Sequence, residues 1–295
     1  MSLLYNYSAV KGFGMARSSL LNVLSTAFAT AVWGTTYVVT TLWLPDGYPL
    51  WSGLLRALPA GLLGLALSRR LPSGEWWWRS LVLGTLTIGA FLPLLFVAAY
   101  TLPGGVAAVF GATQPLIVAG LALVVLAERP TRWRLAWALL AVVGVAVLVL
   151  GPASAFSPLG VAAGFGSTVC MSLGTVLSKK WGRPVGALAY ASWMLTAGGL
   201  VIVPLALAVE GGPPPLDGAA AGAYLWLGLV GGLLAYLLWF RGVSALPAGA
   251  VSFLPLVSPL VAAILGLVVL GETLSPLQWA GFGLAMLAVA ASQRA

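Results

Sequence analysis

Histidine is absent from the 295-residue chain, cysteine occurs once, and only six residues are acidic. Without histidine, neither a Ser–His nor a Cys–His pair can form, and the sequence contains no HExxH or GxxxxGK[ST] motif. The single cysteine, Cys170, excludes a disulfide within the chain. These absences argue against an enzyme, and we expect neither a cofactor nor a bound metal.

Charge of either sign is also scarce. Only 7% of the residues are charged, whereas a globular domain carries roughly a quarter, and 61% are hydrophobic with a mean hydropathy of +1.04. Apolar runs of about 20 residues, long enough to cross a bilayer, recur along nearly the whole chain. The composition therefore predicts an all-α polytopic membrane protein with no soluble domain.

The lengths of the apolar runs, and the Pro and Gly residues between them, predict ten transmembrane helices. Their ranges are 19–41, 51–68, 80–100, 104–126, 135–151, 158–178, 185–209, 218–239, 247–270 and 275–292. The first run lacks a signal-peptide cleavage pattern, so we expect it to be retained. Residues 1–18 before it form either a cytoplasmic or interfacial segment, or an upstream extension with the native start at Met15.

Basic residues follow the asymmetry expected of cytoplasmic loops. With the N-terminus inside, 13 of the 14 Lys and Arg fall on one side, and Arg56 lies within the second span. Four acidic residues fall on the opposite side: Asp46, Glu210, Asp217 and Glu272. We therefore expect both termini in the cytoplasm. The basic residues are dispersed over short loops, which fits membrane lipids as partners and argues against nucleic acid.

Two stretches 144 positions apart are nearly the same. PLIVAGLALVVLAE (115–128) and PLVAAILGLVVLGE (259–272) share nine of fourteen residues, including the proline and the final glutamate. The chain is thus predicted to be a duplication, with five-helix repeats at 19–151 and 158–292. An odd number of spans per repeat turns the second copy over in the membrane. Such inverted-topology repeats are typical of transporters, whose substrate site lies at the repeat interface.

The absences also limit the solute. No predicted span carries a carboxylate at membrane depth, which disfavours cationic drugs, and only Arg56 is available to a multiply anionic substrate. A neutral or zwitterionic solute remains. Without a His or Asp/Glu proton relay, facilitated diffusion is the simpler mechanism, although proton antiport through Glu272 or another helix-end carboxylate stays open.

Paired prolines mark the fourth and ninth spans. Pro115 follows Gln114 and Pro259 follows Ser258, each in mid-span, where proline removes a helical hydrogen bond and frees a carbonyl. Such breaks are tolerated where neighbours or a cavity satisfy the freed group. We expect Pro115 and Pro259 to be hinges and Gln114 and Ser258 to face the substrate, the alternative being kinks that serve packing alone.

Aromatic and polar residues supply the remaining site candidates. Trp33 and Tyr37, four apart, share one face of the first helix at a depth that an interfacial belt explains poorly. Further candidates for the lining are Tyr100, Phe110, Phe165, Phe253 and Ser172. Residues near span ends are expected to anchor the protein at the interface: Trp51, Trp76, Trp77, Trp78, Trp181, Trp226 and Trp239.

Two further features are explained first by structural roles, namely helix packing and a contact with the lipid headgroups. Gly160-Val-Ala-Ala-Gly164 fits the GxxxG motif, which lets helices approach closely. Arg56 lies about five residues from the outer end of its span, roughly 7.5 Å at the helical rise, so we expect it to snorkel to the headgroups. Its functional alternative is a contact with a substrate carboxylate near the outer mouth.

WGTTYVV in the first helix (33–39), together with the endings of the fourth and ninth helices, resembles the EamA group of the drug/metabolite transporter superfamily. The resemblance covers almost the whole chain. It implies a basket in which helices 1, 3, 4, 6, 8 and 9 surround a cavity while 5 and 10 are peripheral. Among its members the chain is most similar to bacterial amino-acid exporters, including the YddG-type exporters of aromatic amino acids.

The leading hypothesis is therefore a transporter that exports amino acids, or similar neutral metabolites, across the bacterial inner membrane, with no oligomer required. Export of purines, sugars or uncharged drugs is an alternative within transport. A membrane-embedded lipid-modifying enzyme or flippase partner is an alternative from another class, but the cytoplasmic loops offer it only Lys, Arg and isolated Glu.

Overall fold

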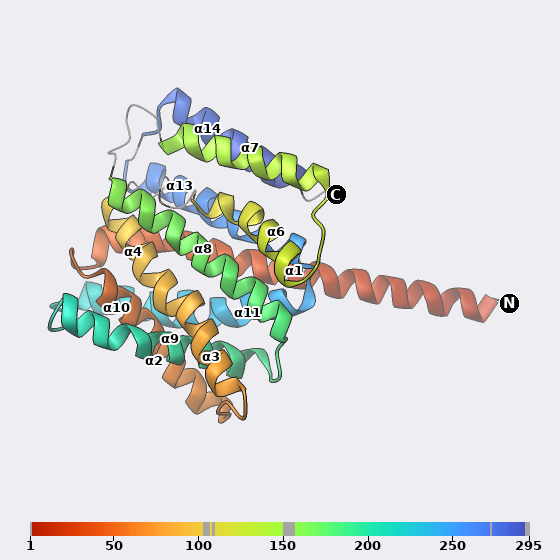
Figure 1. Ribbon diagram of the computed structural model, residues 1–295, viewed down its shortest axis with the longest axis horizontal. Coiled ribbons are helices and arrows are strands. Elements are labelled where there is room, and N and C mark those ends of the chain that lie inside the picture. Colours follow the sequence, from red (N-terminus) through yellow and green to blue (C-terminus); the bar gives the residue numbers. More distant parts are fainter. Residues whose placement is uncertain (1, 103–106, 108–109, 150–156, 272, 293–295) are drawn as a thin grey trace.

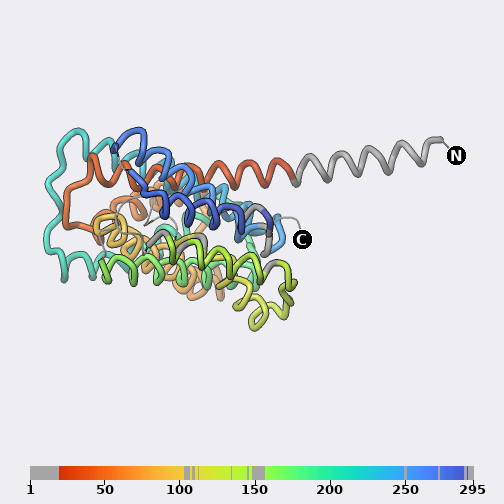
Figure 2. The backbone as a smooth tube through the Cα atoms, turned by 90° about the horizontal axis from the view of Figure 1, so that it is seen from above, coloured from red at the N-terminus to blue at the C-terminus, as the bar shows by residue number. Residues whose placement is uncertain are grey.

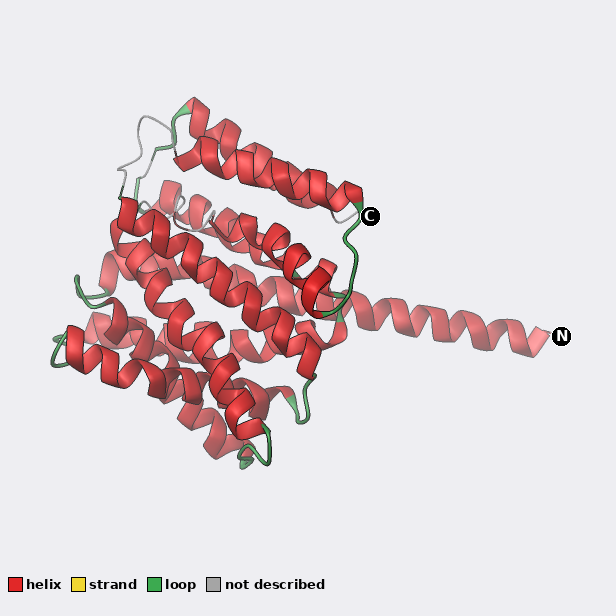
Figure 3. Cartoon of the chain, viewed as in Figure 1, coloured by secondary structure: helices red, strands yellow, loops and turns green. Residues whose placement is uncertain are grey.

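The computed structural model describes residues 2–102, 107, 110–149, 157–271 and 273–292. Within these residues the secondary structure is entirely helical (Figure 3). Consecutive segments join end to end into ten helical rods in this part of the chain. The predicted all-α class is confirmed.

In the first half the segments are α1 (Ser2–Trp43), α2 (Pro49–Ser68), α3 (Trp76–Gly84) with the π-helix η1 (Thr85–Ala90) and α4 (Phe91–Thr101), the 3₁₀ segment η2 (Phe110–Thr113) with α6 (Gln114–Val125), and α7 (Arg132–Val149). In the second half they are α8 (Pro158–Trp181), α9 (Ala187–Val209), α10 (Gly218–Leu225) with the π-helix η3 (Trp226–Leu234) and α11 (Ala235–Ala245), α12 (Ala248–Val251) with η4 (Leu254–Leu256) and α13 (Val257–Val269), and α14 (Pro276–Ser292).

Six helical stretches of the described chain are long and apolar enough to cross a bilayer. They are Leu20–Trp43, Pro49–Ser68, Trp76–Thr101, Pro158–Trp181, Ala187–Val209 and Gly218–Ala245. The other rods are shorter, and three of them contain apolar helices at Gln114–Val125, Leu135–Gly144 and Leu254–Val269. The protein is therefore a multi-pass membrane protein.

The N-terminal segment is helical and continuous with the first span. α1 begins at Ser2, so no break separates 1–18 from the span expected at 19–41. Its N-terminal part projects beyond the other helices (Figure 1). The structure therefore joins this segment to the first span as one helix.

The fourth and ninth spans, predicted at 104–126 and 247–270 with a hinge or kink at a mid-span proline, are interrupted helices in the described residues. α6 begins at Gln114 after a 3₁₀ turn, and α13 begins at Val257 after η4. Pro115 and Pro259 consequently stand in the first turn of a helix, where the missing N–H would have no helical partner. The prolines mark breaks between segments rather than kinks inside one helix.

The offset of 144 residues reappears in the helix ends. α4 ends at Thr101 and α11 at Ala245, while α6 ends at Val125 and α13 at Val269. α7 and α14 begin at Arg132 and Pro276, again 144 apart. Both rods that precede these breaks also contain a π-helix, η1 or η3. The sequence duplication is thus also a duplication of local structure.

Both chain termini lie at one end of the bundle (Figures 1 and 2). The loops that join α2 to α3, α6 to α7, α8 to α9 and α11 to α12 lie there too, and they or the adjoining helix turns carry Arg69, Arg70, Arg79, Arg129, Arg132, Lys179, Lys180, Arg183 and Arg241. We call this the basic end. The loops joining α1 to α2 and α9 to α10 lie at the opposite end and carry Asp46, Glu210 and Asp217.

The core is rich in rings. Trp239, Tyr236, Phe240, Tyr190 and Phe96 are among the largest fully buried side chains. Trp239 has no exposed surface and packs on Trp33 with ring centroids 5.5 Å apart, so its expected role as an interfacial anchor is wrong. α7 and α14 lie side by side along one flank of the bundle, in line with the peripheral place expected for helices 5 and 10 (Figure 1).

Candidate functional site

A pocket in the middle of the bundle brings together residues from both halves of the chain. It is lined by Trp33, Tyr37, Arg56, Phe91, Leu95, Ala107, Phe110, Gly111, Gln114, Ser167, Thr168, Met171, Pro255 and Ser258. Six of the sequence-predicted site residues are thus neighbours here: Trp33, Tyr37, Arg56, Phe110, Gln114 and Ser258. We call this the central pocket.

The central pocket is small in this conformation. Its volume of about 60 Å³ is well below the roughly 300–1,000 Å³ of pockets that hold a small molecule. The residues that line it come from α1, α2, α4, α6, α8 and α13 and the adjoining turns. Helix 2 contributes a residue that the family resemblance did not imply. The pocket must therefore widen before it can hold a small molecule.

Arg56 is the only charged residue among the described residues of the lining, and the expectation that it snorkels to the headgroups is wrong. Its side chain is 1% exposed. Nη1 donates to Thr36 Oγ1 at 3.1 Å and Nη2 donates to the Gly231 carbonyl at 3.1 Å. Both acceptors are neutral, and no residue of the lining is acidic. A cation buried without a counter-ion is costly, so this position favours a ligand that brings a negative charge.

The π-helix η3 supplies the acceptor that holds two pocket residues. The Gly231 carbonyl accepts from Trp33 Nε1 at 2.9 Å as well as from Arg56. Segments of π-helix inside α-helices occur frequently at functional sites. The Trp33 ring is held further by Tyr236, at 5.0 Å between centroids. The ring and the guanidinium are therefore fixed relative to one another.

Two buried donors of the central pocket have no hydrogen-bond partner among the described residues. They are Arg56 Nε and Gln114 Nε2, and the Gln114 side chain is 3% exposed. A buried N–H left without an acceptor costs about 1–3 kcal/mol. Both groups donate, so an oxygen-rich ligand group would satisfy them.

Tyr100 lies outside the central pocket, at the end of the bundle opposite the basic end. Its hydroxyl donates to the Pro45 carbonyl at 3.0 Å and lies 3.0 Å from Ser52 Oγ, which in turn lies 3.1 Å from the Tyr224 hydroxyl. These contacts tie α4 to α2, α10 and the loop after α1. Tyr100 therefore helps to close this end of the bundle.

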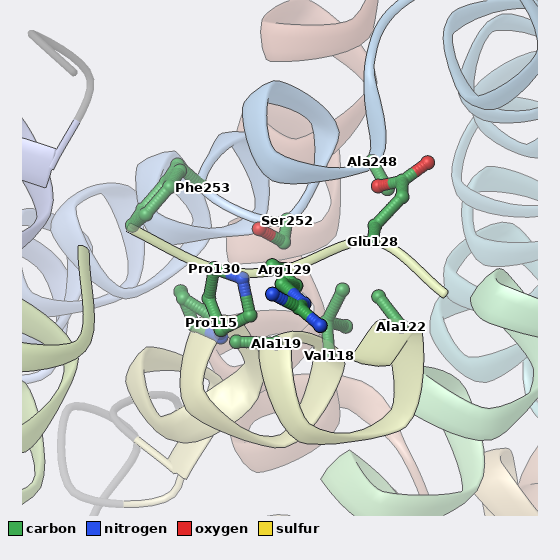
Figure 4. A pocket seen from close by; sticks show the side chains of 10 residues that line it. All are labelled: Pro115, Val118, Ala119, Ala122, Glu128, Arg129, Pro130, Ala248, Ser252 and Phe253. Atoms are coloured by element: carbon green, nitrogen blue, oxygen red, sulfur yellow. The ribbon is translucent and has the colours of Figure 1, made fainter. Parts of the chain in front are cut away.

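Phe253 and Pro115 line a different hollow of about 50 Å³, on the basic side of the central pocket. In Figure 4 the segment of Glu128, Arg129 and Pro130 crosses over α6, between that helix and the segment that bears Ala248 and Ser252. This segment therefore forms one wall of the hollow, together with α6 and the segment before α13.

Three further predictions about α8 have different outcomes. Ser172 is fully buried and donates to the Thr168 carbonyl, so it does not reach the pocket. Phe165 is 49% exposed and is not part of the lining. The packing interpretation of the GxxxG motif is confirmed, because a Cβ added at Gly164 would lie 2.6 Å from the Phe110 ring.

The lining also holds residues that were not among the predicted site residues, among them Phe91, Leu95, Ser167, Thr168 and Met171. Phe91 follows directly on the π-helix η1, a feature with no clear sequence signal. The lining thus combines rings, small hydroxyls and one guanidinium. Within the described residues no group of three His, Cys, Asp or Glu is arranged to hold a metal.

Known proteins resemble this chain over most of its length. The family model of the EamA-like transporter family matches twice, over residues 20–150 and 158–292. Protein PecM of Dickeya dadantii is 43% identical over 256 residues, 86% of each chain. The uncharacterized inner membrane transporter YedA of Escherichia coli is 32% identical over 281 residues, 92% of this chain and 90% of the other.

The fold has a counterpart among solved structures. A crystal structure of a chain with 20% sequence identity superposes with a TM-score of 0.71, over 94% of this chain and 97% of the other. The two matches of the family model and the relatives above together cover nearly every described helix. The chain is a membrane transporter of the EamA-like transporter family, within the drug/metabolite transporter superfamily.

Proposed function

We propose that the protein exports neutral amino acids, including aromatic ones, across the bacterial inner membrane, with both termini in the cytoplasm. The observation that carries the proposal is Arg56, a buried guanidinium without an acidic partner, in a pocket lined by Trp33 and Phe110. A carboxylate would pair with Arg56 and accept from its Nε, and the rings would contact an apolar or aromatic side chain.

The orientation rests on the charge of the two ends. Nine basic residues belong to loops and helix turns at the basic end, while Asp46, Glu210 and Asp217 belong to the opposite end. By the positive-inside rule the basic end faces the cytoplasm. Five rods in each half then give the second repeat the opposite orientation, which is the inverted arrangement that alternating access uses.

The two helix breaks, before α6 and before α13, provide the hinges for alternating access. Hinging at the turns before Pro115 and Pro259 moves α6 and α13, both of which line the central pocket. In the present conformation Tyr100, Ser52 and Tyr224 join the outer ends of three helices. Opening the outer side breaks these hydrogen bonds. Since the pocket has no acidic side chain to carry a proton, facilitated diffusion is the mechanism we favour.

Carboxylic acids without an amino group are a second candidate. None of the residues in the lining is acidic, so an ammonium group would find only carbonyls, hydroxyls and ring faces. A ring-bearing monocarboxylate has no ammonium group and therefore needs no such acceptor. Uncharged purines or sugars fit less well, because they would leave Arg56 without a counter-ion.

Counterflow in proteoliposomes tests the proposal. Purified protein is offered labelled amino acids with aromatic, aliphatic, cationic and anionic side chains, along with benzoate and adenine, with and without a pH gradient. We expect exchange of neutral and aromatic amino acids that does not respond to the gradient. Exchange of adenine alone, or accumulation driven by the gradient, would contradict the proposed substrate or mechanism respectively.

A further inference from the structure

A second cavity, much larger than the central pocket, opens at the basic end. It has a volume of about 550 Å³ and lies between α1, α8, α9 and α11. Its polar lining residues are Asn22, Ser178, Lys179, Arg183, Tyr190, Arg241 and Ser244. We call it the basic cavity. Unlike the central pocket, it is large enough for a small solute as it stands.

Positive charge dominates this lining. Lys179, Arg183 and Arg241 contribute three cations, and no lining residue is acidic. Burial lowers the pKa of Arg183, Tyr190 raises it, and the positive charge of the neighbouring Arg241 lowers it. Glu128 is not part of this lining, but its negative charge lies close enough to Lys179 to attract the ammonium group. A cavity walled by like charges focuses a positive potential that attracts anions.

Two buried hydroxyls in the same wall have no hydrogen-bond partner among the described residues. Ser178 is 5% exposed and Tyr190 is 1% exposed, and the two hydroxyl groups lie close together without reaching hydrogen-bond geometry. Buried hydroxyls are normally satisfied. Hydroxyl donors beside guanidinium groups make a suitable surrounding for an oxyanion.

A series of ring contacts connects the basic cavity to the central pocket. Tyr190 and Phe240 line the cavity, with ring centroids 5.0 Å apart. Phe240 contacts Tyr236 at 5.9 Å, and Tyr236 contacts Trp33 at 5.0 Å. Trp33 lines the central pocket beside Arg56. The four rings of Tyr190, Phe240, Tyr236 and Trp33, which we call the ring layer, therefore link the wall of the basic cavity to the wall of the central pocket.

We propose that the basic cavity is a second oxyanion site, which binds the carboxylate of the transported solute before the solute reaches Arg56. This inference rests on the proposed function. The ring layer acts as the barrier between the two sites, and the positive potential of the cavity excludes cationic solutes at the inner mouth.

A lipid phosphate is the competing occupant, because basic groups at this end also attract anionic headgroups. The geometry favours the solute. Residues of four helices line the cavity, and two of its lining rings, Tyr190 and Phe240, continue through Tyr236 to Trp33 of the central pocket.

Equilibrium binding of labelled L-phenylalanine and of benzoate to the protein in phosphatidylcholine nanodiscs tests the inference. We expect two classes of site in the unmodified protein. Arg56→Gln removes one class, and the Arg183→Gln/Arg241→Gln double variant removes the other, with a loss of at least tenfold in its affinity. Binding at the second class weakens as salt is raised, since it depends on partly exposed charges.

The matched control is the Arg69→Gln/Arg70→Gln double variant, which removes two exposed charges at the same end but outside the cavity. It should retain both classes. The Arg183→Lys/Arg241→Lys double variant keeps both charges and should also retain binding. It thus distinguishes a loss of charge from a loss of folding in the glutamine variant. If Arg56→Gln removes nothing but the cavity variant does, the proposed function fails and the second site stands.

Two results overturn the inference. One is unchanged binding when Arg183 and Arg241 are both neutralised. The other is loss of the second class of site in discs that contain phosphatidylglycerol, with the labelled ligand displaced in proportion to the content of that lipid. The cavity would then be a site for the lipid headgroup.

Discussion

Trp33 and Arg56 donate to the same acceptor, the carbonyl oxygen of Gly231, over 2.9 Å and 3.1 Å. The two donors come from different helices, α1 and α2, and the acceptor lies in the π-helix η3 of the other half of the chain. The ring and the charge of the central pocket are therefore positioned together. A change in either donor is expected to disturb the other.

Replacing Trp33 by phenylalanine tests this coupling. The variant keeps a ring beside Tyr236 but loses the Nε1 donor to Gly231. Loss of one hydrogen bond of about 1–1.4 kcal/mol predicts a fall of roughly 5- to 10-fold in solute affinity. Counterflow and binding measure it, with Trp226→Phe as control, because Trp226 donates to Thr35 Oγ1 away from the pocket. Equal losses in both variants would contradict a specific role for Trp33.

Gly34 sets how closely α1 approaches α13. A Cβ at this position would lie 2.6 Å from the Ser258 carbonyl and 2.7 Å from Val261 Cβ. Gly34→Ala should therefore destabilise the protein by about 1–3 kcal/mol through overpacking, seen as a lower Tm in detergent. Gly120→Ala is the control, since nothing lies within 4 Å of its Cβ position. A Tm of Gly34→Ala equal to that of the control would show that the two helices separate freely.

Tyr100→Phe removes the hydroxyl that joins α4 to Pro45 and Ser52. We expect the outer side to open more often, by a factor of about 5 to 30 for the two hydrogen bonds lost. A cysteine at Ser167 in a Cys170→Ser background reports this as faster labelling by an impermeant reagent from outside. Tyr48→Phe, in the same region of the molecule, should leave the rate unchanged. Slower labelling of Tyr100→Phe would contradict the closing role.

Glu210 caps α2 from the loop after α9. Its two carboxylate oxygens accept from the backbone N–H groups of Leu50 at 2.6 Å and Trp51 at 2.8 Å. Glu210→Gln loses the charge at a helix N-terminus and one acceptor oxygen, for about 0.5–2 kcal/mol of stability. Thermal unfolding measures it against Glu75→Gln, which removes only a surface ion pair with Arg79. A larger effect of Glu75→Gln would rule out the cap.

The helical class, the family and six residues of the central pocket could be predicted from the sequence, whereas the other residues of the lining could not. Composition, the long repeat and the mid-span positions of these residues carry that information. The depth of Arg56 was misjudged, since distance from a helix end does not say which way a side chain points. Ser52 and Ala60, four residues on either side of Arg56, are also buried, so small residues at this spacing indicated an inward face.

The helix breaks and the buried position of Trp239 were harder to predict. Pro115 and Pro259 signal an interruption, but whether the chain kinks or ends one segment and starts another depends on the preceding turn, here η2 and η4. Trp239 lies near the end of a predicted span, and only its contact with Trp33 across the bundle determines that it faces the core. Long-range packing of this kind has no local sequence signal.

The central claim is that Arg56 binds the solute carboxylate. Counterflow of L-phenylalanine and of L-phenylalaninamide, in which the carboxylate is replaced by a neutral amide, is compared between the unmodified protein and Arg56→Gln. We predict that the unmodified protein prefers phenylalanine and that Arg56→Gln lowers this preference at least tenfold, with Arg69→Gln as the control. The preference that remains is due to the basic cavity, which disfavours the cationic amide. An undiminished preference for phenylalanine in Arg56→Gln would contradict the assignment.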